Sequence, residues 1–385
     1  MRYSKIISSL TLLLFISLLS VSCSKESAYP AVTEVIEGVK VITNPDFPRD
    51  GKVQYVMEEE LSIGADETDE NAMLNRPIDL KVAEDGTIYV MDWRDVCIKV
   101  YDSSGKYLRS VGRKGNGPGE FDIPVYMDLS SDGRIFLLDG RNYRVTILDT
   151  AGNHLGGFRV EGYHSSMITD GMNRLYFAKR SRKGSLQDLP ITKDLQEIEN
   201  DVIIFRTNNS GENMFQFGPF RGEKERIRRA GEDSYLSTSP AYSIVWTVDR
   251  EGKLYQGFNQ HYRINVFDTD GNQLFAFGRE YTPVINKRYT GKPIQLKYHP
   301  PYKPVSGVLD EDSNFWIYIY SENEEEAVYD VFSPEGFYIK QVTLPCRILQ
   351  FKDGKAYSIV STEEGFMVVK RFKLIEKSQT IEDQK

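Results

Sequence analysis

The chain has 385 residues, of which 12% are aromatic and 27% are charged, so it can bury a large core and does not have the composition of a disordered polymer. Its formal net charge of −8 argues against the broad basic surface that binds phosphate backbones, so we expect no nucleic-acid partner. Three cysteines are too few for a disulfide framework, so the core must hold the fold together.

The first 22 residues are typical of a secretory signal. Two basic residues precede an apolar run over residues 6–19, and small residues lead to Cys23. This arrangement resembles a bacterial lipobox, although Ser20 replaces the leucine that usually stands three residues before the cysteine. We expect residues 1–22 to be a lipoprotein signal peptide and Cys23 to be lipidated, with ordinary signal-peptidase cleavage as the alternative. Removal of this signal takes away two positive charges and leaves a net charge of −10.

A tether and a folded body follow the predicted signal. Residues 23–52 are polar and contain three prolines, so we predict a flexible tether there. The folded body is expected over residues 53–377 and a polar tail over residues 378–385. The expected location is the bacterial cell envelope, with the lipid anchor as the contact to a membrane and the body facing the periplasm or the cell surface.

The body is built from repeats. Residues 76–112 align with residues 123–158 at a constant offset of 47 residues, and a third copy over residues 249–278 keeps the same internal spacing. Three weaker copies, within residues 172–218, 312–342 and 351–374, bring the total to six. The landmarks that coincide in the first two copies are Pro77 with Pro124, Asp85 with Asp132, Gly86 with Gly133, Asp92 with Asp139, Asp102 with Asp149, and Gly105 with Gly152.

Each repeat predicts four short strands. Runs of alternating, β-branched and aromatic residues are separated by Asp-Gly or Asp-x-x-Gly turns, which indicate antiparallel hairpins rather than helical repeats. A period near 47 residues with four strands is typical of a propeller blade, so we predict an all-β, six-bladed β-propeller of four-stranded antiparallel blades. The last repeat has three clear strands. The lone strand over residues 53–64 is therefore expected to complete blade six and close the ring.

The repeat pattern resembles a known superfamily. The motif P-x-x-[IL]-x-V-x-x-DG-x-[IY]-[YF]-V-x-D, followed by R-[IV]-x-[VI]-[FL]-D-x-x-G and a G-x-G-x-G-P-G-E-F connector, resembles NHL repeats. With the lipoprotein start, the chain looks like the six-bladed β-propeller lipoproteins of Bacteroidetes over about residues 53–375. The resemblance implies a fold and a compartment, but no particular reaction.

The glycine-rich segment over residues 112–124 is interpreted as the connector from blade one to blade two. Its glycines allow the positive φ angles that a sharp change of direction needs. A dinucleotide-binding fingerprint would need a helix after the glycines, whereas another predicted blade follows here.

The connectors sort onto two faces because propeller strands run up and down. Turns between first and second strands and between third and fourth strands share one face, which we call the lower face. Loops between second and third strands and between blades share the upper face. The long insertions, residues 179–200, 219–240, 279–305 and 321–326, all fall on the upper face. Long loops that converge on one rim favour a binding role over random elongation.

The upper face is therefore predicted to bind a glycan, a peptide or an envelope protein. Arg and Tyr side chains there suit anionic or hydroxyl-bearing ligands. Two alternatives stay open: residues 221–229 could form a surface helix with solvated charges, and the resemblance implies that Asp139 mainly braces its own loop. The candidate ligand-binding residues are Arg94, Asp139, Arg141, Arg226, Arg228, Arg229, Tyr262 and Tyr289.

A metal-dependent lyase or hydrolase is the alternative function. His164, His261 and His299 map to the upper face, and some exported propellers of related architecture hold a metal at that mouth. Three ligands are enough for catalytic zinc, and calcium is the other candidate, but the spacing matches no metal motif. No nucleophile or zinc-protease motif is found, so the first hypothesis needs no cofactor and no catalysis. Cys97 and Cys346 are expected to be unpaired core residues.

Overall fold

Short β-strands joined by tight turns make up most of the described chain. The computed structural model describes residues 29–64, 69–160, 164–182, 184–192, 194, 196–229, 231, 235–238, 242–287, 298–305 and 307–377. Residues 31–385 form one unit by their internal contacts, and everything below concerns that unit. No helix among these described residues is long and apolar enough to cross a membrane.

Five sheets form the six blades, because blades 5 and 6 share one eight-stranded sheet. Blade 1 contains β4 (Pro77–Val82), β5 (Ile88–Asp92), β6 (Cys97–Tyr101) and β7 (Tyr107–Val111). Blade 2 contains β10 (Pro124–Leu129), β11 (Ile135–Asp139), β12 (Arg144–Leu148) and β13 (His154–Arg159). Blade 3 contains β14 (His164–Thr169), β15 (Leu175–Arg182), β16 (Gln196–Thr207) and β17 (Asn213–Arg229). The antiparallel order within each sheet is the predicted one.

The remaining blades follow the same order. Blade 4 contains β19 (Ile244–Val248), β20 (Leu254–Phe258), β21 (Arg263–Phe267) and β22 (Gln273–Arg279). Blade 5 contains β23 (Val308–Leu309), β24 (Phe315–Ile319), β25 (Ala327–Phe332) and β26 (Tyr338–Leu344). Blade 6 contains β27 (Gln350–Lys352), β28 (Lys355–Ser361), β29 (Met367–Glu376) and, as its outer strand, β3 (Lys52–Ile63). The six-bladed propeller predicted from the repeats is confirmed.

Hydrogen bonds from side chains connect the first strands of neighbouring blades. Strand β4 lies beside β10 and β27, and β10 lies beside β14. The Asp79 carboxylate accepts the backbone N–H of Met127 at 3.3 Å, and the Asp128 carboxylate accepts that of Thr169 at 2.6 Å. Because the free edge of a first strand has no partner strand, these bonds satisfy part of that edge.

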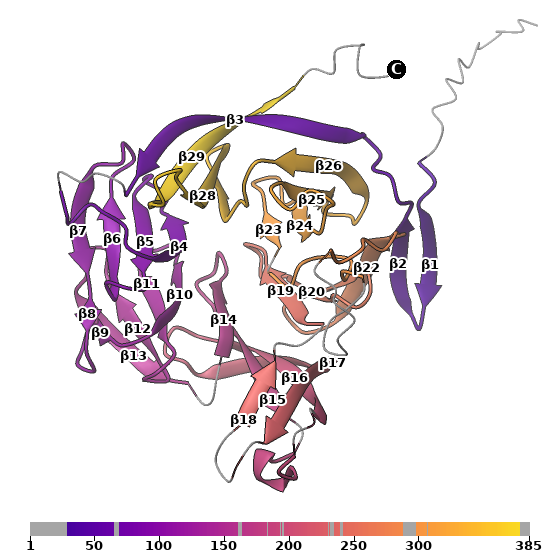
Figure 1. Ribbon diagram of the computed structural model, residues 1–385, viewed down its shortest axis with the longest axis horizontal. Helices are drawn as coiled ribbons and strands as arrows, with labels where there is room; N and C mark the ends of the chain where they lie inside the picture. Colours follow the sequence, from indigo (N-terminus) through magenta and orange to yellow (C-terminus); the bar gives the residue numbers. More distant parts are fainter. Residues whose placement is uncertain are drawn as a thin grey trace, which may run out of the picture. The chain divides into compact units, whose positions relative to one another are not determined.

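Strand β3 closes the ring as predicted and also extends further. Its residues 55–63 pair antiparallel with β29, and residues 52–54 pair parallel with β26 of blade 5. Figure 1 shows β3 as one long strand that passes beside both blades. One N-terminal strand therefore joins the last two blades, which removes an exposed edge from each.

The predicted flexible tether is wrong for residues 31–44. They form a hairpin of β1 (Val32–Ile36) and β2 (Val39–Asn44), and β2 pairs parallel with β22 at the outer edge of blade 4 (Figure 1). Ile42 is fully buried in the core beside Phe277. The buried Asn44 amide donates to the carbonyls of Gly278 at 2.8 Å and Gly336 at 3.0 Å. Val and Ile residues on both sides of Glu37 and Gly38 form a hairpin pattern, but the strand with which β2 pairs lies far away in the sequence.

Two predicted upper-face connectors of blade 3 are largely strand. Residues 213–229 are the single strand β17, which pairs with a lengthened β16 and with β18 (Tyr235–Thr238). The surface-helix alternative for residues 221–229 is therefore wrong. Glu225 and Ile227 lie on the same, buried face of β17, and the Glu225 carboxylate pairs with the Arg182 guanidinium at 2.9 Å. A short 3-10 helix, η1 (Leu186–Asp188), lies in the loop between β15 and β16.

The glycine-rich segment is a connector, as expected. It contains β8 (Arg113–Lys114) and β9 (Glu120–Phe121), which pair parallel with each other between blades 1 and 2. Gly112 has a φ of 77°, and a Cβ there would come within 2.1 Å of the Phe121 ring. The Arg144 guanidinium donates to the carbonyls of Asn116 and Gly117, both at 3.0 Å, which fixes the loop.

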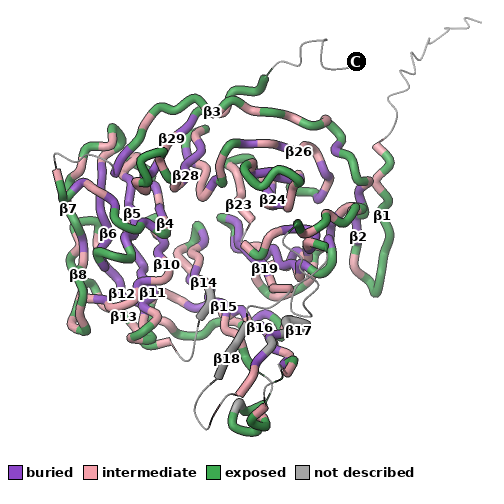
Figure 2. The backbone as a smooth tube through the Cα atoms, in the orientation of Figure 1, coloured by how far each residue is buried: buried purple, intermediate pink, exposed green. Residues whose placement is uncertain are grey.

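The core lies between neighbouring blades. Figure 2 shows that the second and third strands of blades 1 and 2 are buried, whereas the outer strands alternate between exposed and covered positions. Six hydrophobic clusters hold the blades, and each gathers side chains from adjacent sheets. Cys97 and Cys346 are both free, as predicted, although Cys346 is only half-buried.

Candidate functional site

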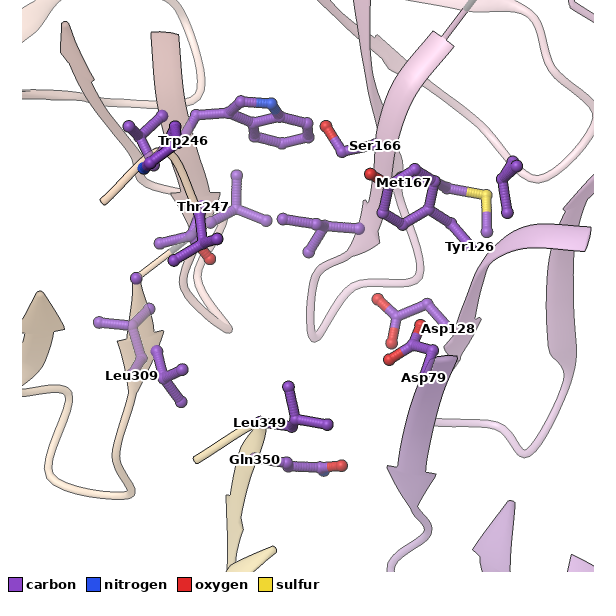
Figure 3. A pocket seen from close by; sticks show the side chains of 18 of the residues that line it. Asp79, Tyr126, Asp128, Ser166, Met167, Trp246, Thr247, Leu309, Leu349 and Gln350 are labelled. Atoms are coloured by element: carbon purple, nitrogen blue, oxygen red, sulfur yellow. The ribbon is translucent and has the colours of Figure 1, made fainter. Parts of the chain in front are cut away.

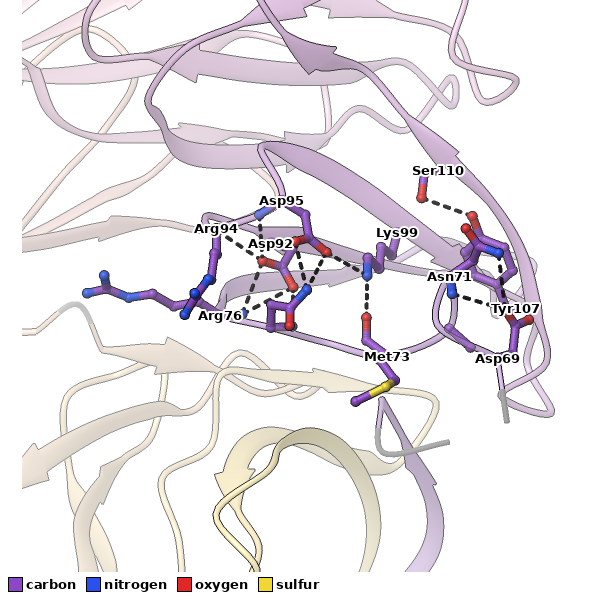
Figure 4. A network of polar contacts seen from close by, with 12 residues as sticks. Asp69, Asn71, Met73, Arg76, Asp92, Arg94, Asp95, Lys99, Tyr107 and Ser110 are labelled. Carbon is purple, nitrogen blue, oxygen red and sulfur yellow. Dashed lines mark hydrogen bonds and ion pairs between the residues drawn. The ribbon is translucent and has the colours of Figure 1, made fainter. Parts of the chain in front are cut away.

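A buried aspartate fixes the upper-face loop of blade 1. Asp92 ends β5 with a fully buried side chain, and its carboxylate accepts the backbone N–H groups of Asn75 at 2.7 Å, Arg76 at 3.1 Å, Arg94 at 3.1 Å and Asp95 at 3.2 Å. Figure 4 shows this network between two segments that are far apart in sequence. Four donors on one carboxylate hold both segments in one conformation.

The fixed loop presents an exposed aromatic side chain beside cations. The Trp93 side chain is 38% exposed, and the Arg76 guanidinium lies 4.5 Å from its ring centroid. Arg94, a predicted ligand-binding residue, is exposed beside it, and Figure 4 shows its guanidinium extending away from the network. We call Arg76, Trp93 and Arg94 the blade 1 cluster. Its flat ring and two guanidinium groups suit hydroxyl-bearing or anionic ligands.

Blade 2 repeats the same brace. Asp139 is fully buried, and its carboxylate accepts the backbone N–H groups of Asp122 at 2.9 Å and Arg141 at 3.1 Å and the side-chain amide of Asn142 at 2.6 Å. Its carboxylate is therefore engaged within the loop, which is the bracing role that the repeat resemblance implied. Arg141 is exposed and its guanidinium pairs with the Asp122 carboxylate at 2.9 Å. Direct ligand contact by Asp139 is a prediction that this geometry does not favour.

A second aromatic and cationic group lies on the upper face at blade 5. The His299 ring stacks on Tyr320 with a centroid distance of 4.0 Å and an interplanar angle of 11°. The Lys303 ammonium lies 3.8 Å from the Tyr318 ring centroid, and the Tyr298 side chain is 44% exposed. We call these five residues the blade 5 cluster. They come from the connector between blades 4 and 5 and from the end of β24.

Tyr262 is buried, so its position does not favour the predicted contact with a ligand. Its side chain is 9% exposed in the core between blades 4 and 5, and its hydroxyl donates to the buried Asp330 carboxylate. The Arg279 guanidinium lies 4.8 Å from its ring centroid and pairs with Asp330 at 2.7 Å. Burial, together with the Asp330 carboxylate, raises the pKa of Tyr262 well above its ordinary value. These contacts seal two blades against each other.

The predicted arginine rim has a structural role where it is described. Arg229 ends β17, and its guanidinium donates to the carbonyls of Leu189 at 3.1 Å and Gly231 at 3.2 Å. It therefore ties the β15–β16 loop to β17. Arg228 lies on the same strand and is half-buried. The Arg226 side chain, Tyr289 and Cys23 lie outside the described residues, so their predicted roles stay predictions.

The predicted histidines do not form a described metal site. His261 is exposed after β20, whereas His299 is held in the stack on Tyr320. His164 starts β14, and its side chain is outside the described part of the chain. Among the described residues no group of three or more His, Cys, Asp and Glu side chains could hold a metal ion. The zinc or calcium alternative therefore has no donor set there.

Sequence reasoning missed a cavity on the axis, where the first strands of the six blades meet. It has a volume of about 610 Å³ and is lined from β4, β10, β14, β19, β23 and β27 and from nearby connectors. Figure 3 shows the carboxylates of Asp79 and Asp128 side by side, pointing into the cavity, with Leu309 and Leu349 across from them. The signal in the sequence was a charged residue at an innermost-strand position, as in the stretches PIDLKV and PVYMDL.

The electrostatics of this cavity are unusual. The Lys81 ammonium lies 3.5 Å from the Asp128 carboxylate and also faces Asp79. Burial raises the pKa of Asp79, and Asp128 adds to this effect while Lys81 opposes it. Burial lowers the pKa of Lys81, but the two carboxylates outweigh it and raise that pKa overall. A second hollow, of about 700 Å³, shares Lys81 and Asp128 and continues to the lower face.

Comparisons with known proteins agree with this architecture. The DUF5128 family model, described as a 6-bladed beta-propeller, matches residues 37–215. The chain is a six-bladed β-propeller. A solved member of the duf4221 family from Bacteroides vulgatus has a similar structure, with a TM-score of 0.54 and 12% identity over 86% of this chain and 100% of that one. No curated protein matches the chain.

Two further solved structures are similar to this propeller. A Bacteroides fragilis protein described as exported has a TM-score of 0.51 and 11% identity over 87% of this chain and 98% of that one. A virginiamycin B lyase from Staphylococcus aureus has a TM-score of 0.44 and 12% identity over 83% of this chain and 99% of that one. At such low identity these likenesses concern the fold, and the lyase likeness carries no argument about activity.

Proposed function

We propose that this protein is a lipid-anchored binding protein of the cell envelope that uses the upper face of its propeller to hold a glycan, a peptide or another envelope protein. The observation that carries the proposal is the blade 1 cluster on a loop fixed by Asp92. Trp and Arg side chains supply much of the energy at many binding surfaces. A fixed loop loses little conformational freedom when it binds, so more of that energy becomes affinity.

The distribution of charge on the molecule supports this proposal. The chain is acidic overall, whereas the blade 1 cluster places Arg76 and Arg94 at the exposed Trp93 side chain, and the blade 5 cluster places Lys303 beside the half-buried Tyr318 ring. Locally positive, ring-bearing patches on an acidic body favour ligands with hydroxyl or anionic groups and disfavour long polyanions. The proposed partners are therefore glycans, peptides and envelope proteins, with no nucleic acid and no cofactor.

The proposed location rests on the N-terminal sequence. The signal-like residues 1–22 and Cys23 support export and lipidation, and the likeness to a Bacteroides fragilis protein described as exported fits them. Mass spectrometry of the mature N-terminus tests this part. A diacylated Cys23 in the membrane fraction is expected, and an unmodified N-terminus in the soluble fraction would refute the anchor.

Array binding tests the upper face. The mature protein is screened on glycan and peptide arrays, and the ligand it captures is titrated against Trp93→Ala and Lys106→Ala. Trp93→Ala should weaken binding by about tenfold or more, because it removes the exposed ring that lies against the Arg76 guanidinium. Lys106 is an exposed residue in a lower-face turn of the same blade, so Lys106→Ala should bind as the unchanged protein does. Equal affinity of Trp93→Ala and the unchanged protein would refute the upper-face site.

A further inference from the structure

The axial cavity has the dimensions and walls of a small-ligand site. Its volume of about 610 Å³ lies within the range of pockets that bind small molecules, roughly 300–1,000 Å³. Apolar side chains from several blades line it, among them Ile168, Leu309 and Leu349. Polar groups supply more of the lining than apolar ones, and the charged side chains are gathered at particular places. Localised charges beside apolar walls are typical of a pocket that orients its ligand.

One wall of the cavity carries acceptors for a cation. The Asp79 carboxylate accepts two backbone N–H groups, from Leu80 at 2.9 Å and Met127 at 3.3 Å. A carboxylate has about four acceptor positions, so Asp79 keeps room for further donors. The two carboxylates face one ammonium, that of Lys81. A second ammonium at this wall would balance the two negative charges and form charge-assisted hydrogen bonds.

The upper end of the same cavity carries two guanidinium groups. Arg180 lies near the end of β15 and Arg347 lies in the connector that leads to β27, and both line the cavity. The second strand of each blade ends on the upper face, and the connectors between blades also lie there. Both arginines are therefore at the upper end of the cavity. Arg347 is exposed. Guanidinium groups at the mouth favour a carboxylate there.

The strand register gives the separation between the two polar ends. Pro77 of β4 and His164 of β14 hold equivalent positions at the upper ends of their strands, and His164 pairs with Lys179. Arg180 is therefore one residue above this level, and Asp79 is one to two residues below it, because the register shifts between Pro77 and Asp79. Two to three residues of strand span roughly 7–10 Å, which is about the length of an extended dipeptide or tripeptide.

We propose that the axial cavity binds a short apolar peptide of two or three residues with free termini. The peptide ammonium lies at Asp79 and Asp128, and its carboxylate lies at Arg180 and Arg347. Its side chains contact the apolar walls. A metal ion suits this cavity less well, because the Lys81 ammonium already interacts with both carboxylates and Leu309 and Leu349 lie opposite them. This site does not depend on the blade 1 cluster, so either proposal can fail alone.

Peptides with blocked ends test the proposal. The mature protein is titrated by calorimetry with Ala-Leu-Ala, with its N-acetylated form and with its C-terminal amide. Each block should weaken binding about tenfold or more, because acetylation removes the ammonium and amidation removes the carboxylate. Asp79→Asn should reduce the preference for the free N-terminus and leave the other preference unchanged, whereas Arg347→Gln should reduce only the preference for the free C-terminus. Asparagine at position 79 keeps an oxygen that can accept the Met127 N–H, so the blade contact is retained.

Selectivity separates binding from damage to the fold. Lys106→Ala, in a lower turn, should keep both preferences. Equal affinity for the free and both blocked peptides would overturn the proposal, and so would the absence of binding to all three. A uniform loss of affinity for all three peptides in both Asp79→Asn and Arg347→Gln would show a structural effect and would also overturn it. The exposed position of Arg347 keeps its variant informative even if Asp79→Asn fails to fold.

Discussion

Two aspartates of blade 1 accept backbone N–H groups with their carboxylates, Asp92 on the upper face and Asp102 on the lower face. They differ in how far along the sequence the donors lie. The Asp102 carboxylate accepts the N–H groups of Ser104 at 2.9 Å and Lys106 at 3.0 Å, all within one turn. The Asp92 carboxylate accepts N–H groups from its own loop and from Asn75 and Arg76, which lie 17 and 16 residues earlier. The lower turn therefore supplies all these donors itself, whereas the upper loop also needs the N–H groups of a second segment, which contains Asn75 and Arg76.

This difference explains why one face can specialise. The lower turn leaves small polar side chains at the surface, and blades 2 and 4 repeat it with Asp149 and Asp268. The Asp92 brace joins residues 75–76 to residues 93–95, and we call these two segments the upper platform. Side chains on the upper platform are free to differ between blades. Trp93 in blade 1 and Tyr143 in blade 2 are both exposed there. The lower turns keep the hairpins of the fold in place with local hydrogen bonds, and the longer-range hydrogen bonds of the upper loops hold a surface whose side chains can vary.

Removal of the upper brace should have the largest effect on stability. Asp92→Ala leaves several backbone N–H groups without their acceptor in a fully buried position, so the free energy of unfolding should fall by about 3–5 kcal/mol. Asp102→Ala, the matched change in the exposed lower turn, should lower the free energy of unfolding much less. Urea unfolding followed by tryptophan fluorescence measures both. Equal losses would show that the two braces do not differ in the way described above.

Lys99 offers a second test of the upper platform, with a smaller expected loss. Its side chain is 4% exposed, and its ammonium pairs with the Asp95 carboxylate at 2.8 Å and donates to the Met73 carbonyl. Lys99→Met keeps the aliphatic stem but leaves these acceptors without their donor, so unfolding should become easier by about 1–3 kcal/mol. Lys106→Met in the lower turn is the control and should change little. Unchanged stability of Lys99→Met would mean that Asp92 alone fixes the platform.

Local spacing explains which parts of the fold the sequence could predict. Asp102 and Gly105 form their turn within four residues, so a repeat of 47 residues was enough to find the blades. Strand β3 was predictable because blade 6 lacked an outer strand. The pairing of strand β2 was not, although its Val and Ile residues form a strand pattern, because its partner β22 is more than 200 residues away and no local pattern marks a parallel addition to a blade edge.

The candidate sites divide in the same way. The exposed loop position of Arg94 could be predicted because its loop follows a repeated Asp. The burial of Tyr262 could not, because its neighbours Arg279 and Asp330 come from other strands of the ring. Asp79 and Asp128 were missed because they meet only when β4 and β10 lie side by side. A single sequence shows which residues are charged, but not which strands place them together.

Trp93→Ala should separate binding from stability. The side chain is 38% exposed and caps no blade, so its removal should lower the free energy of unfolding by less than about 1 kcal/mol. Ligand binding should fall much more, as argued above for the arrays. The same urea unfolding experiment measures stability. A loss as large as that of Asp92→Ala would show that Trp93 is part of the brace rather than part of the surface it presents.

The smallest effect concerns pH, and it separates the lower turns from the axial cavity. Side-chain and backbone donors of Asn153 lower the pKa of Asp149, and equivalent contacts of Asn272 lower that of Asp268, whereas burial raises the pKa of Asp79. A carboxyl with a lowered pKa in the folded state adds stability that is lost as pH falls through that pKa. A raised pKa has the opposite sign: its contribution is present below the unfolded value and is lost as pH rises through the folded pKa. Asp79→Asn should therefore gain stability relative to the unchanged protein as pH rises, whereas Asp149→Asn should lose stability. Carboxyl carbon NMR titration checks the cause directly, and titration of Asp79 at a lower pH than Asp149 and Asp268 would contradict it.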